Sequence, residues 1–392
     1  MRLEGRDIVC LGTADWETEL PINQHQLMRR LAPRNRVLFV ESLGLRRPQL
    51  AGRDLGRIWR RLRKGLRPPR AVDGLHVLSP LVLPFHGSSV VRALNRRLLR
   101  HQLRTAVRRL GMRRPLLWAY APQAEALLEV LEPETVVYHC VDDVAAQKGV
   151  DAESFRAVER RFAGRADLVL TSAPALAERM RSLAADVLYA PNVADTALFA
   201  TALQPGPLDP ALERLPAPRL VFQGAVVATK LDLDLLAETA AARPEWSIVM
   251  VGPRGAGDPG ADLSALDRAP NVHLLGPREE RELPAVLRGA DAGLIPYAIN
   301  DLTRSVFPMK VYEYLAAGLP VLSTPLPALD GIEGVEIVAD AVQLVAAAEA
   351  AIAADAPERR AARSRAAASH SWEARIEQIE QALDGPDRRA VD

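Results

Sequence analysis

Short apolar runs alternate with helical stretches along the whole chain, and turn residues bound each run. Strands of a parallel sheet read as such runs because helices cover both of their faces. The runs in the first half lie at 8–11, 37–40, 75–78, 116–119, 136–138, 168–171 and 187–189. A second series follows at 219–223, 247–251, 272–274, 292–295, 321–323 and 336–338. The alternation predicts α/β structure with two doubly wound parallel sheets in series.

The length of the chain agrees with two domains. Its 392 residues are enough for two cores of ordinary size, and 48% of them are hydrophobic, as in globular proteins. We expect the first domain at 1–193 and the second at 194–370. Ligands of open parallel sheets bind beyond the carboxyl ends of the strands, so two sheets facing across a cleft would hold a ligand there.

Composition argues against several other classes of protein. No apolar run is long enough to span a bilayer, and the acids Glu4 and Asp7 precede the first apolar run, which does not fit a signal peptide. Cys10 and Cys140 lack the spacing of zinc ligands or of a disulfide framework, and each is expected near a strand end. We therefore expect a cytoplasmic protein.

Positive charge is concentrated in one block. Between Arg29 and Arg114, 22 arginines and one lysine stand against three acids, a net charge of +20, although the whole chain carries only +1. The densest part, Arg57–Arg67, has apolar residues between its cations. It would contact an anionic membrane surface or an anionic acceptor; the alternative is a solvated helix in an Arg-rich chain. No nucleic-acid-binding motif accompanies the charge, so nucleic acid is not expected as a partner.

One segment, P-M-K-V-Y-E-Y-L-A-A-G-L-P-V-L-S-T at 308–324, carries an isolated acid in an apolar setting. It predicts a helix that contains Glu313 and ends at Gly318, followed by a buried strand. Lys310 and Arg304 lie near that acid, so the segment would hold a ribose diol and a diphosphate together. The alternative is a solvated amphipathic helix with one surface ion pair.

The pattern K-x-x-E-Y-L-A-x-G-x-P-V resembles the donor-binding helix of retaining GT-B glycosyltransferases of family 4, the glycosyl transferases group 1. The resemblance implies two Rossmann-like domains facing across a cleft, with Glu313 gripping the ribose of a nucleotide sugar. A-P-N-V-A-D-T-A-L-F at 190–199 resembles the turn that leads into the second domain of this family. By the same resemblance, a terminal helix at 371–392 crosses back and completes the first domain.

The loop after the strand at 219–223 is the expected diphosphate site. Gly224 follows that strand, and Lys230 precedes a helix, where a lysine suits the local charge only if an anion binds there. The alternative for Lys230 is an ordinary exposed lysine. The family usually has an Arg directly after the glycine, and here that residue is Ala225. Arg304 or Lys310 would stand in for the missing cation.

Other donor contacts follow from the resemblance. The loop from Gly276 to Arg278 would bind the base through its backbone, with uracil as the first choice. The family's first acid, eight residues before Glu313, is Ser305 here, which leaves the donor sugar open. Thr303, Arg304 and Ser305 would then lie beside the transferred sugar and its phosphates.

His139 is expected just beyond a first-domain strand, at the ligand-binding edge, where it would touch a sugar hydroxyl or take the acceptor's proton. It matches a catalytic position of the family, although an isolated histidine at a strand end is more often structural. Asp142 would pair with it or hold the acceptor, and Asp143 is a further candidate for the acceptor. The two aspartates lack the Asp-x-Asp spacing of metal-dependent transferases, so no metal requirement is expected.

Gly12 and Thr13 follow the first strand and would approach the donor phosphates or the acceptor. Trp16 and His25 resemble a W-x(n)-Q-H pattern in a subgroup that contains proteins assigned to teichuronic-acid biosynthesis. Trp16 would stack on a sugar and His25 would line the acceptor site; the alternative for both is core packing.

Together these features predict a retaining glycosyltransferase that moves a sugar from a nucleoside diphosphate donor, most simply UDP, to a hydroxyl acceptor. Its machinery would comprise His139, Asp142 and Lys230, with the nucleotide sugar as co-substrate and no cofactor. Two alternatives remain open: a nucleotide-sugar 2-epimerase of the same fold, and a non-catalytic protein that binds nucleotide sugars. The acceptor and the oligomeric state are not encoded in any pattern identified above.

Overall fold

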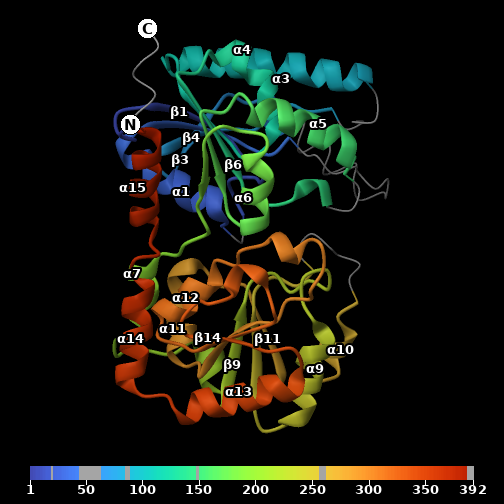
Figure 1. Cartoon of the computed structure of the whole chain (residues 1–392), viewed down its shortest axis with the longest axis vertical. Helices are drawn as coiled ribbons and strands as arrows, with labels where there is room; N and C mark the ends of the chain where they lie inside the picture. The colour runs from blue at the N-terminus through green and yellow to red at the C-terminus, as the bar shows by residue number, and fades with distance from the viewer. Residues whose placement is uncertain (19–20, 44–62, 84–88, 147–149, 256–261, 386–392) are drawn as a thin grey trace. The chain divides into compact units, whose positions relative to one another are not determined.

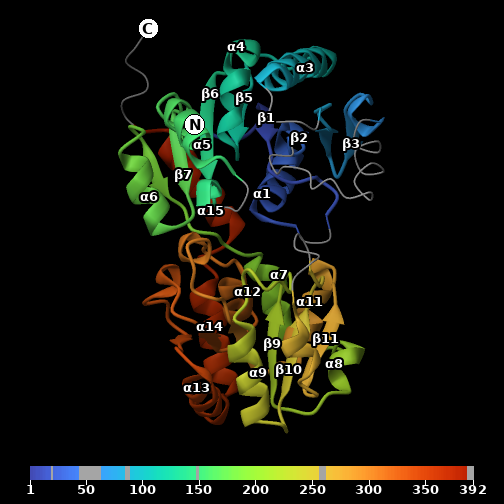
Figure 2. The same ribbon diagram turned by 90° about the vertical axis from the view of Figure 1, so that its right-hand side faces the viewer.

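The computed structural model describes residues 1–18, 21–43, 63–83, 89–146, 150–255 and 262–385. The chain divides into two compact units (Figure 1). The first consists of Met1–Pro191 and Glu377–Asp392, and the second consists of Asn192–Ile376. Each unit contains one β-sheet with helices packed on it, as Figure 2 also shows.

The sheet of the first unit has the strand order β3-β4-β2-β1-β5-β6-β7-β8. Its strands are β1 (Asp7–Leu11), β2 (Arg36–Val40), β3 (Arg70–Val72), β4 (Leu75–Leu78), β5 (Leu116–Ala119), β6 (Thr135–Cys140), β7 (Leu168–Thr171) and β8 (Val187–Tyr189). Strand β1 lies between β2 and β5, with Val9 opposite Leu38 and Leu117. The sheet is parallel except for β3, and the expected strands are confirmed.

Strand β3 was not predicted. It pairs antiparallel with β4 through a tight hairpin whose two central residues, Asp73 and Gly74, both have positive φ, 50° and 78°. An Asp-Gly pair is the preferred sequence for such a turn. The D-G at 73–74 was therefore the signal that could have revealed this strand.

Helices cover both faces of the first sheet. They are α1 (Asn23–Leu31), α3 (Ser89–Arg109), α4 (Leu128–Leu131), α5 (Ala152–Ala163) and α6 (Pro174–Arg181). Val9 and Leu11 face a core shared with α3 to α6, and the alternate residues Ile8 and Cys10 are equally buried on the other face. Cys10 and Cys140, at the ends of β1 and β6, are buried free thiols.

The sheet of the second unit has the order β11-β10-β9-β12-β13-β14, and all its pairs are parallel. Its strands are β9 (Arg219–Gln223), β10 (Ser247–Val251), β11 (Val272–Gly276), β12 (Ala292–Ile295), β13 (Val321–Ser323) and β14 (Val335–Ile337). Its helices are α7 (Thr196–Ala200), α8 (Pro210–Glu213), α9 (Leu233–Ala242), α10 (Ser264–Asp267), α11 (Leu283–Arg288), α12 (Lys310–Ala316), α13 (Ala341–Ala353) and α14 (Pro357–Ala367). This order is that of a Rossmann sheet.

The last helix, α15 (Trp372–Leu383), begins in the second unit and ends in the first. Its Trp372 is buried, and Ser371 before it forms a bridge with Ala194. Within the first unit, the N–H of Leu3 donates to the Glu380 carboxylate over 2.7 Å. The end of α15 is thus tied to the segment that leads into β1.

None of the described helices has the length and apolar character needed to cross a membrane. Of the basic segment Arg57–Arg67, only the part from Arg63 onward lies within the described residues.

Candidate functional site

The second sheet reverses its direction of growth between β9 and β12. At such a switch point the loops after the two strands part, and ligands of doubly wound sheets bind there. Gln223 is the last residue of β9, Gly224 begins the loop after it, and the loop after β12 leads into Tyr297. Helix α12 contributes Lys310 and Glu313 to the same place through the contacts described next.

Helix α12 is held against this edge by Tyr314. Its hydroxyl accepts a hydrogen bond from the backbone N–H of Gln223 over 2.8 Å. Its ring fits only because residue 293 is glycine, since a Cβ there would lie 2.4 Å from the ring. Gly318, with a φ of +82°, follows the C-cap residue of the helix, which confirms its predicted C′ position. Tyr314, the second tyrosine of the Y-E-Y motif, therefore fixes the position of α12 against the sheet.

The carboxylate of Glu313 is partly buried and accepts a hydrogen bond from the Gln223 side-chain amide. Burial raises the pKa of Glu313 to about 7, and the nearby charge of Lys310 opposes that rise. The other amide atom, Gln223 Oε1, is buried and has no hydrogen-bond partner among the described residues. A buried acceptor without a donor costs free energy, so Gln223 Oε1 is available to accept a hydrogen bond from a polar ligand.

Lys310 provides the positive charge next to that pair. Its Nζ donates to the Tyr297 hydroxyl over 2.7 Å and lies 5.3 Å from the centre of the Phe222 ring. It also lies 3.6 Å from where a Cβ of Gly224 would be. Burial would raise the pKa of Tyr297, but the charges of Lys310 and Lys230 hold it below its ordinary value. Of the two substitutes for the missing arginine, Lys310 is the one that the structure places beside Gly224.

Glycines allow the neighbouring loops to meet backbone to backbone. The N–H of Gly224 donates to Val251, and the N–H of Gly252 donates to Gly276. A Cβ at position 252 would lie 2.0 Å from the carbonyl oxygen of Gly224, and the φ of Gly252 is +151°. No other residue fits there without displacing the loop that contacts Lys310.

Lys230 lies in the loop between β9 and α9 and is partly exposed. Its carbonyl oxygen accepts a hydrogen bond from the N–H of Ala298 over 2.9 Å, which fastens this loop to the one after β12. Asp232 caps α9 by accepting from the N–H of Leu235. The predicted phosphate ligand is therefore on the same edge as Lys310 and Tyr297.

The three residues predicted beside the sugar form a short 3-10 helix, Thr303–Ser305. The Thr303 side chain is fully buried, and its hydroxyl donates to the carbonyl of Ala298, so it shapes the loop from inside. This side chain is not positioned to touch a sugar. Arg304 is exposed and Ser305 is partly exposed, which leaves these two as the accessible members.

Arg278 is committed to a structural contact. Its guanidinium donates to Asp209 over 2.7 Å and to the carbonyl of Leu275 over 2.9 Å. The Asp209 carboxylate also caps α8, and the ion pair lowers the pKa of Asp209. At Gly276, whose φ is +72°, a Cβ would meet no atom within 4 Å, so the loop is open on that side, although the Gly276 carbonyl oxygen accepts a hydrogen bond from the N–H of Gly252.

His139 differs from its prediction in position. It lies inside β6 rather than beyond it, and its side chain is buried. The ring stacks on Tyr120, with centroids 4.7 Å apart, and accepts a hydrogen bond from the Trp118 indole over 3.4 Å. It belongs to the packed aromatic layer under the carboxyl edge of the first sheet, so direct contact with an acceptor requires that layer to open.

Trp16 and His25 are also buried, and the two rings pack on Phe39. This arrangement agrees with the core-packing alternative for both. Packing against Phe39 explains why residue 12 is glycine, because a Cβ there would lie 2.4 Å from the Phe39 ring. Thr13, next to it, is exposed, and its N–H donates to the buried Gln24 side chain over 2.8 Å.

Asp142 and Asp143 follow β6 and are both partly exposed. The Asp143 carboxylate accepts from Arg156 over 3.1 Å and lies 3.9 Å from Arg179. Asp143 is thus neutralised within its own unit. No cluster of three or more potential metal ligands exists among the described residues.

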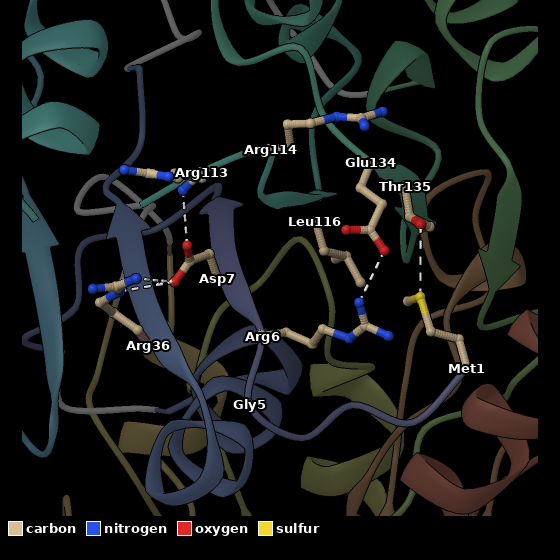
Figure 3. A pocket seen from close by; sticks show the side chains of 10 residues that line it. All are labelled: Met1, Gly5, Arg6, Asp7, Arg36, Arg113, Arg114, Leu116, Glu134 and Thr135. Atoms are coloured by element: carbon tan, nitrogen blue, oxygen red, sulfur yellow. Dashed lines mark hydrogen bonds and ion pairs between the residues drawn. The ribbon is translucent and has the colours of Figure 1, made fainter. Parts of the chain in front are cut away.

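A separate pocket of about 200 Å³ opens at the opposite edge of the first sheet (Figure 3). It is lined by Asp7, Arg36, Leu116 and Thr135, which are the first residues of β1, β2, β5 and β6. Two of its four arginines are paired with acids: Arg36 with Asp7 over 2.7 Å, and Arg6 with Glu134 over 2.9 Å. This amino-terminal edge is not where open parallel sheets bind their ligands.

Sequence reasoning missed two members of the β9–β12 group. Gln223 directly precedes Gly224. Its role in the site comes from its hydrogen bond to Glu313, a residue that is distant in sequence. Tyr297 ends the motif I-P-Y after a predicted strand, and a polar aromatic residue at a switch point was a usable signal. The positions of Gln223 and Tyr297 at the switch point can be recognised only when the strand order is known.

The raised pKa of Glu313 gives a testable pH dependence. Between its ordinary value of 4.5 and about 7, the folded protein holds a proton that the unfolded chain has released. The free energy of unfolding should therefore fall by up to about 3 kcal/mol as the pH rises through that window. Glu313→Gln should remove this slope and leave the free protein more stable than wild type at pH 8.

Urea unfolding at pH 5.5 and pH 8 measures this difference. Glu336→Gln, at an exposed position in β14, is the matched control and should keep the wild-type slope. Equal slopes in wild type and Glu313→Gln would show that Glu313 is ionised in the folded protein throughout this range.

Comparison with known proteins finds a family match within the second unit. Residues 217–372 match the family described as Glycosyl transferases group 1. The chain is also 31% identical, over 224 residues, to the "Putative teichuronic acid biosynthesis glycosyltransferase TuaH" of Bacillus subtilis (strain 168). That alignment covers 54% of this chain and 55% of TuaH, so the chain spans about half the length of this curated relative.

Solved structures share the fold of the whole chain. The sucrose-phosphate synthase of Thermosynechococcus elongatus superposes with a TM-score of 0.69 at 15% identity, covering 97% of this chain and 98% of that one. HepE of Anabaena, solved in complex with UDP, has a TM-score of 0.65 at 14% identity and coverages of 97% and 99%. The chain therefore has the GT-B fold of two parallel-sheet α/β domains, and its residues 217–372 match the family of glycosyl transferases group 1.

Proposed function

We propose that this chain is a retaining glycosyltransferase that moves a sugar from a nucleoside diphosphate sugar, with UDP as the nucleotide, to a hydroxyl acceptor. The observation that carries the proposal is the contact of Glu313 with Gln223 beside Lys310 and Tyr297, at the switch point of the matched domain. Structures of HepE in complex with UDP and with UDP-glucose, which share this fold, support UDP as the nucleotide.

The ribose would bind at Glu313. An ionised carboxylate accepts two hydrogen bonds at once, which suits a vicinal diol. Gln223 Oε1 would gain its missing donor from a second group of the nucleoside. Deprotonation of Glu313, whose pKa is about 7, would then accompany nucleotide binding.

The diphosphate would lie between Gly224 and the two lysines. Lys310 is already fixed by Tyr297, so its ammonium group needs little rearrangement to meet an anion. Lys230 adds a second charge from the loop that is bonded to Ala298. In this proposal these cations neutralise the leaving diphosphate, and the reaction needs no metal ion.

The chemical step would be a front-face displacement. The bond between the anomeric carbon and the β-phosphate oxygen breaks, and the acceptor oxygen bonds to the same face of that carbon. The acceptor's proton passes to the departing phosphate oxygen, so UDP and a glycoside of unchanged anomeric configuration are formed. The protein contributes position and charge. In the first unit, Thr13 and Asp142 are the accessible candidates for holding the acceptor.

Thermal unfolding with a panel of UDP, GDP and ADP tests the nucleotide. A ligand at 100 times its dissociation constant stabilises the folded protein by about 2.7 kcal/mol, which raises the melting temperature by several degrees. We expect that rise with UDP and a much smaller one with GDP and ADP. A larger rise with GDP or ADP would contradict the nucleotide assignment.

Proton NMR of the products then tests the reaction. Incubation of the protein with a UDP-sugar that raises its melting temperature should give UDP and a sugar product that retains the donor's anomeric configuration. An altered UDP-sugar without release of UDP would indicate the epimerase. Unchanged donor in the presence of binding, across a panel of sugars and acceptors, would indicate a non-catalytic binding protein.

A further inference from the structure

Helix α3 (Ser89–Arg109) carries seven arginines and no acid. Leu99, Leu103 and Ala106 on one side of it are buried in the core of the first unit. The opposite side exposes Arg97, Arg104 and Arg108, and none of these three has an ion-pair partner within the described chain. Figure 1 shows α3 as a long helix on the outside of the first unit.

Several arginines elsewhere in this unit are paired with acids. Arg36 binds Asp7, and Arg161 binds Glu125 over 2.8 Å. On α3, Arg104 and Arg108 are instead four residues apart, a spacing at which like charges destabilise a helix. The cost is removed when an anionic surface lies against the helix, so this cationic face has the character of a binding surface.

Exposed apolar side chains accompany the cations. Leu94, on α3 itself, is 42% exposed. The Gln102 side chain donates to the carbonyl of Gly65 over 2.6 Å, which places the segment 63–67 along α3. Leu66 of that segment is 75% exposed. Cations with exposed leucines among them match the interface of a bilayer, where charges meet headgroups and leucines enter the acyl boundary.

We propose that the cationic face of α3 and the segment 63–67 dock on an anionic lipid bilayer. A nucleic acid or another soluble polyanion would use the arginines but would leave the two leucines in water. The surface consists of first-unit residues only and shares none with the donor site. The proposal therefore stands or falls independently of the proposed glycosyl transfer.

Co-sedimentation with vesicles tests the charge component. The full chain should bind vesicles of phosphatidylcholine with 30% phosphatidylglycerol, bind pure phosphatidylcholine far more weakly, and be released by 0.5 M salt. Arg97→Gln with Arg104→Gln should weaken binding about twenty-five-fold, at about fivefold for each arginine near the surface. Arg359→Gln with Arg365→Gln, exposed positions on α14, removes the same charge and should change little.

The leucines separate a membrane from a soluble polyanion. Leu66→Ser with Leu94→Ser should weaken vesicle binding about tenfold and leave retention on heparin unchanged. Val342→Ser, at a position on α13 that is 79% exposed, is the apolar control and should bind vesicles like wild type. Equal binding to neutral vesicles, equal loss in either control, or no effect of the leucine changes would overturn the proposal.

Discussion

Glu313→Ala should abolish the thermal stabilisation by UDP and reduce kcat/KM for a UDP-sugar at least a hundredfold. The substitution removes two charge-assisted hydrogen bonds to the ribose, each worth about 1.5 kcal/mol or more. It also leaves the Gln223 amide, which donates to Glu313, without its partner. The nucleotide would then lose the carboxylate that binds its ribose, and Gln223 would no longer be held by that carboxylate.

The loss must be one of binding rather than of folding. Removing a partly buried carboxylate whose pKa is raised to about 7 should not destabilise the free protein at pH 8. Its melting temperature without ligand should therefore stay at or above that of wild type. Glu336→Ala is the matched control and should retain the full response to UDP. A Glu313→Ala protein that still binds UDP like wild type would refute the ribose assignment.

Lys310→Met should lower kcat for a UDP-sugar by a factor of one hundred to one thousand. The diphosphate gains negative charge as the glycosidic bond breaks, so a cation beside Gly224 stabilises the transition state more than the bound donor. Lys310 lies close to Gly224 and is oriented by Tyr297. Methionine keeps the length and apolar stem of the side chain, so packing on Phe222 should survive.

Two further measurements test whether the effect of Lys310→Met comes from the loss of the positive charge. Ultraviolet titration of the variant should show a higher pKa for Tyr297, because burial raises that pKa and Lys310 is the stronger of the two charges that lower it. Arg359→Met removes one positive charge from an exposed position on α14 and should leave kcat unchanged. If Lys310→Met turned over donor as fast as wild type, the diphosphate would have to bind elsewhere.

Much of the fold could be predicted because its strands are buried on both faces. Runs such as residues 248–251 are continuous blocks of apolar residues whose length and boundaries indicate strands directly. Strand β3 has no such block, since Arg70 and Val72 are only partly buried at the edge of the sheet. The alternation also indicated two sheets, but the order of their strands depends on pairings that no local pattern contains.

The candidate site was predictable to a lesser extent. Glu313 and Lys310 stand on one helix, so their proximity follows from sequence spacing. The contacts of Glu313 with Gln223 and of Lys310 with Tyr297 join segments far apart in the chain and require the fold. Burial is what the sequence does not show: His139 and Thr303 have suitable chemistry, but both side chains lie inside their domains.

A crystal structure of the protein with bound UDP tests the central claim most directly. We expect both ribose hydroxyls within hydrogen-bond distance of the Glu313 carboxylate, and the diphosphate between Gly224 and the Lys310 ammonium group. UDP bound away from the loops after β9 and β12, with Glu313 still bonded only to Gln223, would contradict the account.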